Sequence, residues 1–102
     1  MVYKIQYLPI ALKDLKEIVK YITHELEAPR AAEKFLKKID NEVLKIAKNP
    51  FRCHIFSLSG KLKNEYRFLH INNYSLFYIV ERNKVEIHRI VYSRRDILFN
   101  NK

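Results

Sequence analysis

Apolar residues recur at two different periods along this chain, and the change of period marks the predicted elements. Residues 2–8 alternate apolar and polar side chains, which is typical of a half-buried strand. Residues 10–26 and 29–48 place apolar side chains three and four positions apart, which predicts two helices with one apolar face each. Asn49-Pro50 ends the second helix, and the short link between the helices predicts an antiparallel hairpin.

The second half of the chain alternates again and predicts three strands, at residues 65–71, 74–80 and 85–92. The middle strand is apolar at nearly every position, as expected at the centre of a sheet. Strict alternation along the last strand places on one face Val85, Ile87, Arg89 and Val91, and on the other Glu86, His88, Ile90 and Tyr92. Residues 51–64 show no clear period and are interpreted as a basic loop that could include a short strand.

The predicted order is therefore β-α-α-β-β-β, which is an α+β fold. We expect the helix hairpin to pack on one face of a mostly antiparallel four-stranded sheet and to leave the other face partly open. A short C-terminal tail or helix follows the last strand. A chain of 102 residues, 48% of them hydrophobic, suits a single domain covering residues 1–102.

Charge is the first indication of function. Twenty Lys and Arg residues against eleven Asp and Glu give a formal net charge of +9, and such a surface attracts nucleic acid, acidic lipid or acidic protein segments. The single cysteine, Cys53, excludes a disulfide within the chain and fits a reducing compartment. No stretch approaches the ~18 apolar residues of a membrane span, and the first residues lack the apolar run of a signal peptide. We therefore expect a cytoplasmic protein without a membrane partner.

Motifs for nucleotide binding, serine hydrolysis or zinc proteolysis are missing from the sequence. Four histidines are present, and they lack the spacing of metal ligands: His24, His54, His70 and His88. We expect neither a metal nor a cofactor.

Basic residues of the second half are the main candidates for a site. The candidate anion-binding or target-binding residues are Lys61, Lys63, Arg67, Arg89, Arg94 and Arg95. Arginines from adjacent strands can converge on one phosphate or carboxylate, and RNA cleavage would need such a cluster with a base. His70, His88, Tyr92 or a lysine could supply the base. In the alternative interpretation these are ordinary ion pairs, between Asp96 and a neighbouring arginine or between Arg89 and Glu86 or another carboxylate.

Three segments in this order resemble the RelE/ParE superfamily of type II toxin–antitoxin toxins. The segments are ALKDLKEIVKYI, AAEKFLKKIDNEVLKIAKNP and EYRFLHINNYSLFYIVERNKVEIHRIVYSRRD, and the resemblance covers about residues 3 to 98. It implies the β-α-α-β-β-β fold and a bacterial toxin that inhibits growth. It also implies a cognate antitoxin whose acidic segment wraps the toxin, so that a toxin–antitoxin hetero-oligomer forms.

The superfamily has two main targets. RelE-like members cleave mRNA on the ribosome, whereas ParE-like members inhibit DNA gyrase and are not nucleases. A RelE-like mechanism would assign catalysis to Arg67, Arg94 and Tyr92 without a metal. However, Ser75 stands where RelE-like nucleases usually carry an arginine, and Phe99 and Asn100 stand near the position of their C-terminal tyrosine. The long helix hairpin and the strand end Y-S-R-R-D favour a ParE-like toxin, with plasmid stabilisation as the associated role. An inactive relative that only binds its antitoxin is the third alternative.

Overall fold

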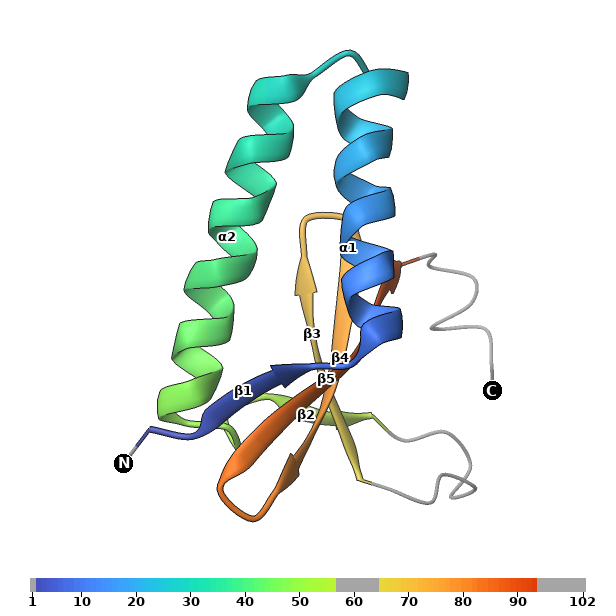
Figure 1. Cartoon of the computed structure of the whole chain (residues 1–102). Coiled ribbons are helices and arrows are strands. Elements are labelled where there is room, and N and C mark those ends of the chain that lie inside the picture. Colours follow the sequence, from blue (N-terminus) through green and yellow to red (C-terminus); the bar gives the residue numbers. More distant parts are fainter. Residues whose placement is uncertain (1, 57–64, 94–102) are drawn as a thin grey trace.

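The structure, a computed structural model, describes residues 2–56 and 65–93. Two helices lie side by side against a five-stranded sheet (Figure 1), which confirms the predicted α+β fold. The elements in chain order are β1 (Lys4–Tyr7), α1 (Pro9–Lys20), the π-helical segment η1 (Tyr21–Glu25), α2 (Pro29–Lys48), β2 (His54–Phe56), β3 (Tyr66–Ile71), β4 (Tyr74–Glu81) and β5 (Lys84–Tyr92). The predicted C-terminal tail or helix lies outside the described residues.

The strand order in the sheet is β1-β5-β4-β3-β2. Neighbouring strands are antiparallel except for β1 and β5, which are parallel, with Lys4 opposite Lys84. The sheet is thus mostly antiparallel, as predicted, but it has five strands where four were expected. The additional strand, β2, lies in the segment 51–64 for which a short strand was considered, and its three residues are too few to show a period of their own in the sequence.

The helix hairpin is confirmed. The π-helical segment η1 continues α1, and the backbone N–H of Ala28 then donates to the Ile22 carbonyl at 3.0 Å. Glu27 has a φ of 50°, the left-handed conformation that commonly ends a helix. Helix α2 starts at Pro29, whose missing N–H costs nothing in a first helical turn.

The core lies between the helices and the inner face of the sheet. Fully or almost fully buried residues of this core include Phe35, Ile39 and Ile46 of α2, Leu76 and Tyr78 of β4, and Ile87 and Ile90 of β5. Burying one such side chain contributes on the order of 1.5–3 kcal/mol. In the described ranges, no helix combines the length and the apolar character needed to cross a membrane.

A β-bulge changes the faces of β5. Tyr78 of β4 is opposite Ile87 and Phe77 is opposite Arg89, so His88 is an extra residue on β5. The strict alternation predicted for this strand therefore holds as far as His88, which shares a face with Glu86, and is wrong from Arg89 onwards. Ile90 joins Ile87 in the core at a spacing of three residues, and Arg89 lies exposed beside His88.

Candidate functional site

The face of the sheet opposite the helices carries aromatic and titratable side chains. Phe56 of β2, Phe68 of β3 and Phe77 of β4 pack together there, with ring centroids 5.0 to 6.0 Å apart. Neighbouring strands supply polar groups to the same face, because side chains two residues apart on a strand point the same way. We call this surface the open face.

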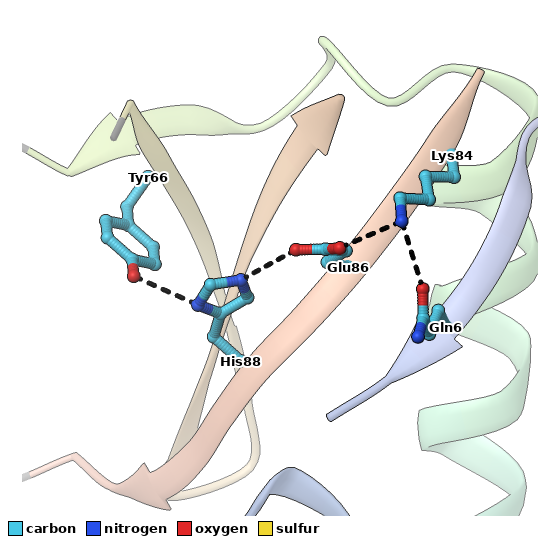
Figure 2. A network of polar contacts seen from close by, with 5 residues as sticks. All are labelled: Gln6, Tyr66, Lys84, Glu86 and His88. Atoms are coloured by element: carbon cyan, nitrogen blue, oxygen red, sulfur yellow. Dashed lines mark hydrogen bonds and ion pairs between the residues drawn. The ribbon is translucent and has the colours of Figure 1, made fainter. Parts of the chain in front are cut away.

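A row of polar contacts crosses the open face from β3 to β1 (Figure 2). The Tyr66 hydroxyl lies 2.9 Å from His88 Nδ1, and His88 Nε2 lies 3.2 Å from a carboxylate oxygen of Glu86. Lys84 Nζ is 3.1 Å from the other oxygen of Glu86 and donates to the Gln6 side-chain oxygen at 3.3 Å. Lys84, Glu86 and His88 follow one another at a spacing of two residues on β5, so they share this face.

The row has the chemistry of an acid–base relay. If His88 carries its proton on Nε2, it donates to Glu86 and accepts from the Tyr66 hydroxyl, so that all three groups are satisfied. The carboxylate fixes the ring and stabilises the imidazolium that forms when Nδ1 takes a proton. Hydrogen bonds from Lys84 and then from His88 lower the pKa of Glu86, which keeps this carboxylate charged.

A pocket of about 340 Å³ adjoins the relay. Its lining consists of Leu8, Ile10, Phe56, Tyr66, Phe77, His88 and Arg89. Most of this lining is apolar, and its polar groups are the Tyr66 hydroxyl, the His88 imidazole and the Arg89 guanidinium. A planar aromatic group with an adjacent anion would match these walls.

Arg89 is held by helix α1. Its Nε and one Nη donate to the two carboxylate oxygens of Asp14 at 2.7 and 3.1 Å, and the same carboxylate accepts from the backbone N–H of Ile90 at 3.0 Å. Asp14 thus accepts a backbone N–H of β5 beyond the residues that pair with β1. Its hydrogen bonds with the guanidinium raise the pKa of Arg89. The prediction that Arg89 pairs with Glu86 or another carboxylate is confirmed, with Asp14 as the carboxylate.

Arg67 lies on the other side of the sheet. It is directly opposite Tyr78, whose ring is in the core, so its side chain leaves β3 on the helix side. One Nη donates to the Cys53 carbonyl at 2.7 Å and to the Phe51 carbonyl at 3.3 Å, and the guanidinium lies 5.1 Å from the Phe51 ring centroid. A 3.5 Å ion pair with Glu65 completes its contacts, and only 13% of the side chain is exposed. Arg67 therefore fixes the segment that follows α2.

Ser75 occupies a small hydroxyl–imidazole cluster at the far end of the open face. Its buried hydroxyl contacts His70 Nδ1 at 3.0 Å and also the Ser93 hydroxyl, which lies 3.2 Å from the same nitrogen. Tyr92, in contrast, packs edge-on against Tyr74, whose ring contacts Phe35 of α2. Tyr92 and the hydroxyl cluster thus lie on different faces of the sheet.

The structure does not bring the predicted basic residues together among the positions that it describes. Arg67 and Arg89 lie on opposite faces, and each binds other groups of the chain. Four of the candidates lie outside the described residues: Lys61, Lys63, Arg94 and Arg95. In residues 2–56 and 65–93, no group of three or more His, Cys, Asp or Glu side chains could hold a metal ion.

The comparison that decides the family covers almost the whole chain. Residues 5–97 match the model of the ParE toxin of the type II toxin–antitoxin system, parDE. The chain belongs to the ParE toxin family. It is therefore a member of the RelE/ParE superfamily of type II toxins, as its sequence motifs indicated.

Solved structures share the fold of this ParE-family chain. The chromosomal ParDE toxin–antitoxin system from P. aeruginosa matches with a TM-score of 0.73 at 19% identity, over 91% of this chain and 98% of that one. The YoeB dimer from Staphylococcus aureus matches at 0.59 and 21% identity, over 92% and 100% of the two chains. The E. coli DinJ-YafQ toxin–antitoxin complex matches at 0.58 and 17% identity, over 97% and 99%. The search of curated proteins returned no match.

Sequence reasoning on this ParE-family chain found part of the relay and missed the rest. His88 is among the candidate bases that the sequence indicates, whereas Tyr66 is not. Glu86 was considered only as a partner of Arg89, because a strictly alternating strand has no bulge that would turn Arg89 towards α1. Asp14 gave no signal at all, because it is one of several charged residues on the polar side of its helix.

Proposed function

We propose that this ParE-family chain inhibits bacterial growth by acting on DNA gyrase and is neutralised by a cognate antitoxin. The match of residues 5–97 to the ParE toxin family carries the proposal. The positions of Arg67 and Arg89 support a toxin that needs no convergent arginine site, because both side chains are engaged in holding the fold.

The antitoxin is expected on the helix hairpin. An apolar groove of about 400 Å³ runs between the helices and is lined by Leu12, Leu15, Lys16, Val19, Lys20, Thr23, His24 and Leu36. An amphipathic antitoxin segment with acidic residues could place its apolar side chains in the groove and its carboxylates beside the two lysines. The net charge of +9 attracts such a segment over a distance.

One induction experiment tests the proposed target. The chain is expressed without antitoxin, and growth, plasmid supercoiling, gyrase–DNA cleavage complexes and mRNA ends are followed together. We expect growth arrest with accumulated cleavage complexes and intact mRNA, reversed by coexpression of the antitoxin. Unchanged gyrase activity during growth arrest would contradict the proposal. Normal growth would instead support an inactive, antitoxin-binding relative.

The relay on the open face supports a second candidate, a metal-independent mRNA endonuclease that acts on the ribosome. A base is needed to remove the proton of the RNA 2′-hydroxyl, and His88 between Tyr66 and Glu86 is arranged to accept a proton. The aromatic pocket beside it could hold a base, with Arg89 near the phosphate. H88A should then abolish mRNA cleavage during induction. Toxicity unchanged by H88A, with no mRNA ends in either strain, would exclude this candidate.

A further inference from the structure

The solvent-facing side of α2 carries a row of positive charges along nearly its full length. The row consists of Arg30, Lys34, Lys37, Lys38, Lys45 and Lys48, with Asn41 among them, and every one of these residues is exposed. At 3.6 residues per turn these positions fall within an arc of about 100°, opposite the buried face of the helix. Eighteen rises of 1.5 Å make the row about 27 Å long. We call this row the basic stripe.

The acidic residues of α2 do not interrupt the basic stripe. Glu33, Asp40 and Glu42 lie outside its arc on either side, by the same helical geometry. Within the described ranges, the ion pairs of the stripe are limited to that of Lys45 with Glu42 at 3.2 Å. Lys38 donates to the neutral Asn72 side chain at 3.3 Å and keeps its charge uncompensated. The row therefore remains a strip of nearly uniform positive potential.

We propose that the basic stripe is a contact surface for the phosphate backbone of duplex DNA. The surface is a convex helix on the outside of the molecule (Figure 1), and an α-helix about 10–12 Å across fits the roughly 12 Å wide major groove of B-DNA. The major groove of A-form RNA is too narrow for it. Five of the six cations are lysines, which act as point charges on phosphates, so the contact is independent of sequence.

A membrane surface fits the basic stripe less well. Helices that bind bilayers bury an apolar face between the lipid headgroups. The apolar face of α2, with Phe35, Ile39 and Ile46, is already buried in the core of this chain. The acidic antitoxin segment is assigned to the apolar groove between the helices, on a different side of α2 that includes Leu36. Duplex DNA thus remains the polyanion whose shape matches a straight, exposed and evenly charged helix.

The test measures DNA binding directly and needs no gyrase, so its outcome is independent of the proposed target. The full chain is titrated into a fluorescent 20-base-pair DNA duplex of mixed sequence (about two helical turns) over a range of salt concentrations. The stripe variant is K34Q/K37Q/K48Q. The matched control is K4Q/K13Q/R82Q, which removes the same three positive charges from exposed positions outside α2. Circular dichroism melts verify that both variants fold.

The stripe variant should bind the duplex at least roughly tenfold more weakly than the native chain, because each lysine that neutralises a phosphate contributes a salt-dependent factor. Its plot of log K against log salt should be shallower by about 0.9 for each phosphate that is no longer neutralised, whereas the control should keep the native slope. The single variant K37Q should reduce the slope by about 0.9, as for one phosphate. It serves as the second readout if the triple variant has a lowered melting temperature. Equal weakening in stripe variant and control would overturn the proposal. So would tighter binding to duplex RNA or to phosphatidylserine vesicles, or no binding by the native chain.

Discussion

Replacing Arg67 by alanine should destabilise the fold strongly, although sequence reasoning places this residue in a catalytic or anion-binding site. The side chain is 13% exposed and donates to the Cys53 carbonyl at 2.7 Å and the Phe51 carbonyl at 3.3 Å. A hydrogen bond from a charged group contributes about 1.5–3 kcal/mol, and the stacking on Phe51 adds about 0.5–1 kcal/mol. The mostly exposed Glu65 adds little. We expect R67A to lower the free energy of unfolding by about 3 kcal/mol.

Urea unfolding followed by circular dichroism measures this loss. The midpoint should fall by roughly 1 M or more at an unchanged m-value, which shows that stability and not the unfolded state has changed. Thermal melts should shift by more than about 10 °C. R30A, at an exposed position of α2, is the matched control and should cost less than about 0.5 kcal/mol. R67K keeps the charge but loses the planar fork, and should recover less than half of the loss.

The reasoning would be refuted if R67A were as stable as R30A. Arg67 would then not be needed to fix the segment after α2. If R67A also lost toxicity while remaining folded, the residue would have a direct role in function, as a nuclease mechanism requires.

Three further predictions concern the other contacts of the sheet and hairpin. D14A should lower stability by about 2 kcal/mol, since it removes the carboxylate that binds Arg89 and an edge N–H of β5; urea midpoints no lower than the native one would contradict it. The lowered pKa of Glu86 means that its contribution is present above the unfolded value of 4.5 and is lost as pH falls through the folded value. The native chain should therefore lose more stability than E86Q between neutral pH and about pH 3, and parallel losses would argue against this coupling. L12E places a charge in the apolar groove and should weaken antitoxin binding, measured by calorimetry, at least roughly tenfold, with little effect on stability. An unchanged affinity would show that the antitoxin binds at another surface.

Periodicity predicted the elements well where burial is one-sided and the element is long. The spacing of Phe35, Ile39, Val43 and Ile46 predicts α2 and its buried face correctly, because each turn of the helix repeats the same choice between core and solvent. The three residues of β2 offer no such repetition, and this strand exists because β3 pairs with it. Its presence is decided by tertiary contacts that local sequence does not encode.

The candidate site was harder to predict because single residues decide it. A bulge at His88 moves Arg89 beside α1 and brings Ile90 into the core, whereas an assumed strict alternation through the adjacent polar residues His88 and Arg89 puts both Arg89 and Ile90 on the wrong face. Arg67 binds backbone carbonyls, which every residue has, so no complementary side chain in the sequence points to its role. The net charge and the arginines of the sequence indicated that the chain binds anions, but they did not indicate on which face of the sheet or helices the anion would bind.

The parallel pairing of β1 with β5 has a consequence for how the toxin is made. Lys4 pairs with Lys84, so the first strand has its partner only after some eighty further residues have been added. At ribosomal rates of 5–20 residues per second, β1 waits about 4 to 16 s for β5. Strand β5 also supplies Ile87 and Ile90 to the core beneath the helices. A ribosome that stops before β5 therefore releases a chain in which β1 has no partner strand and is not joined to the rest of the sheet.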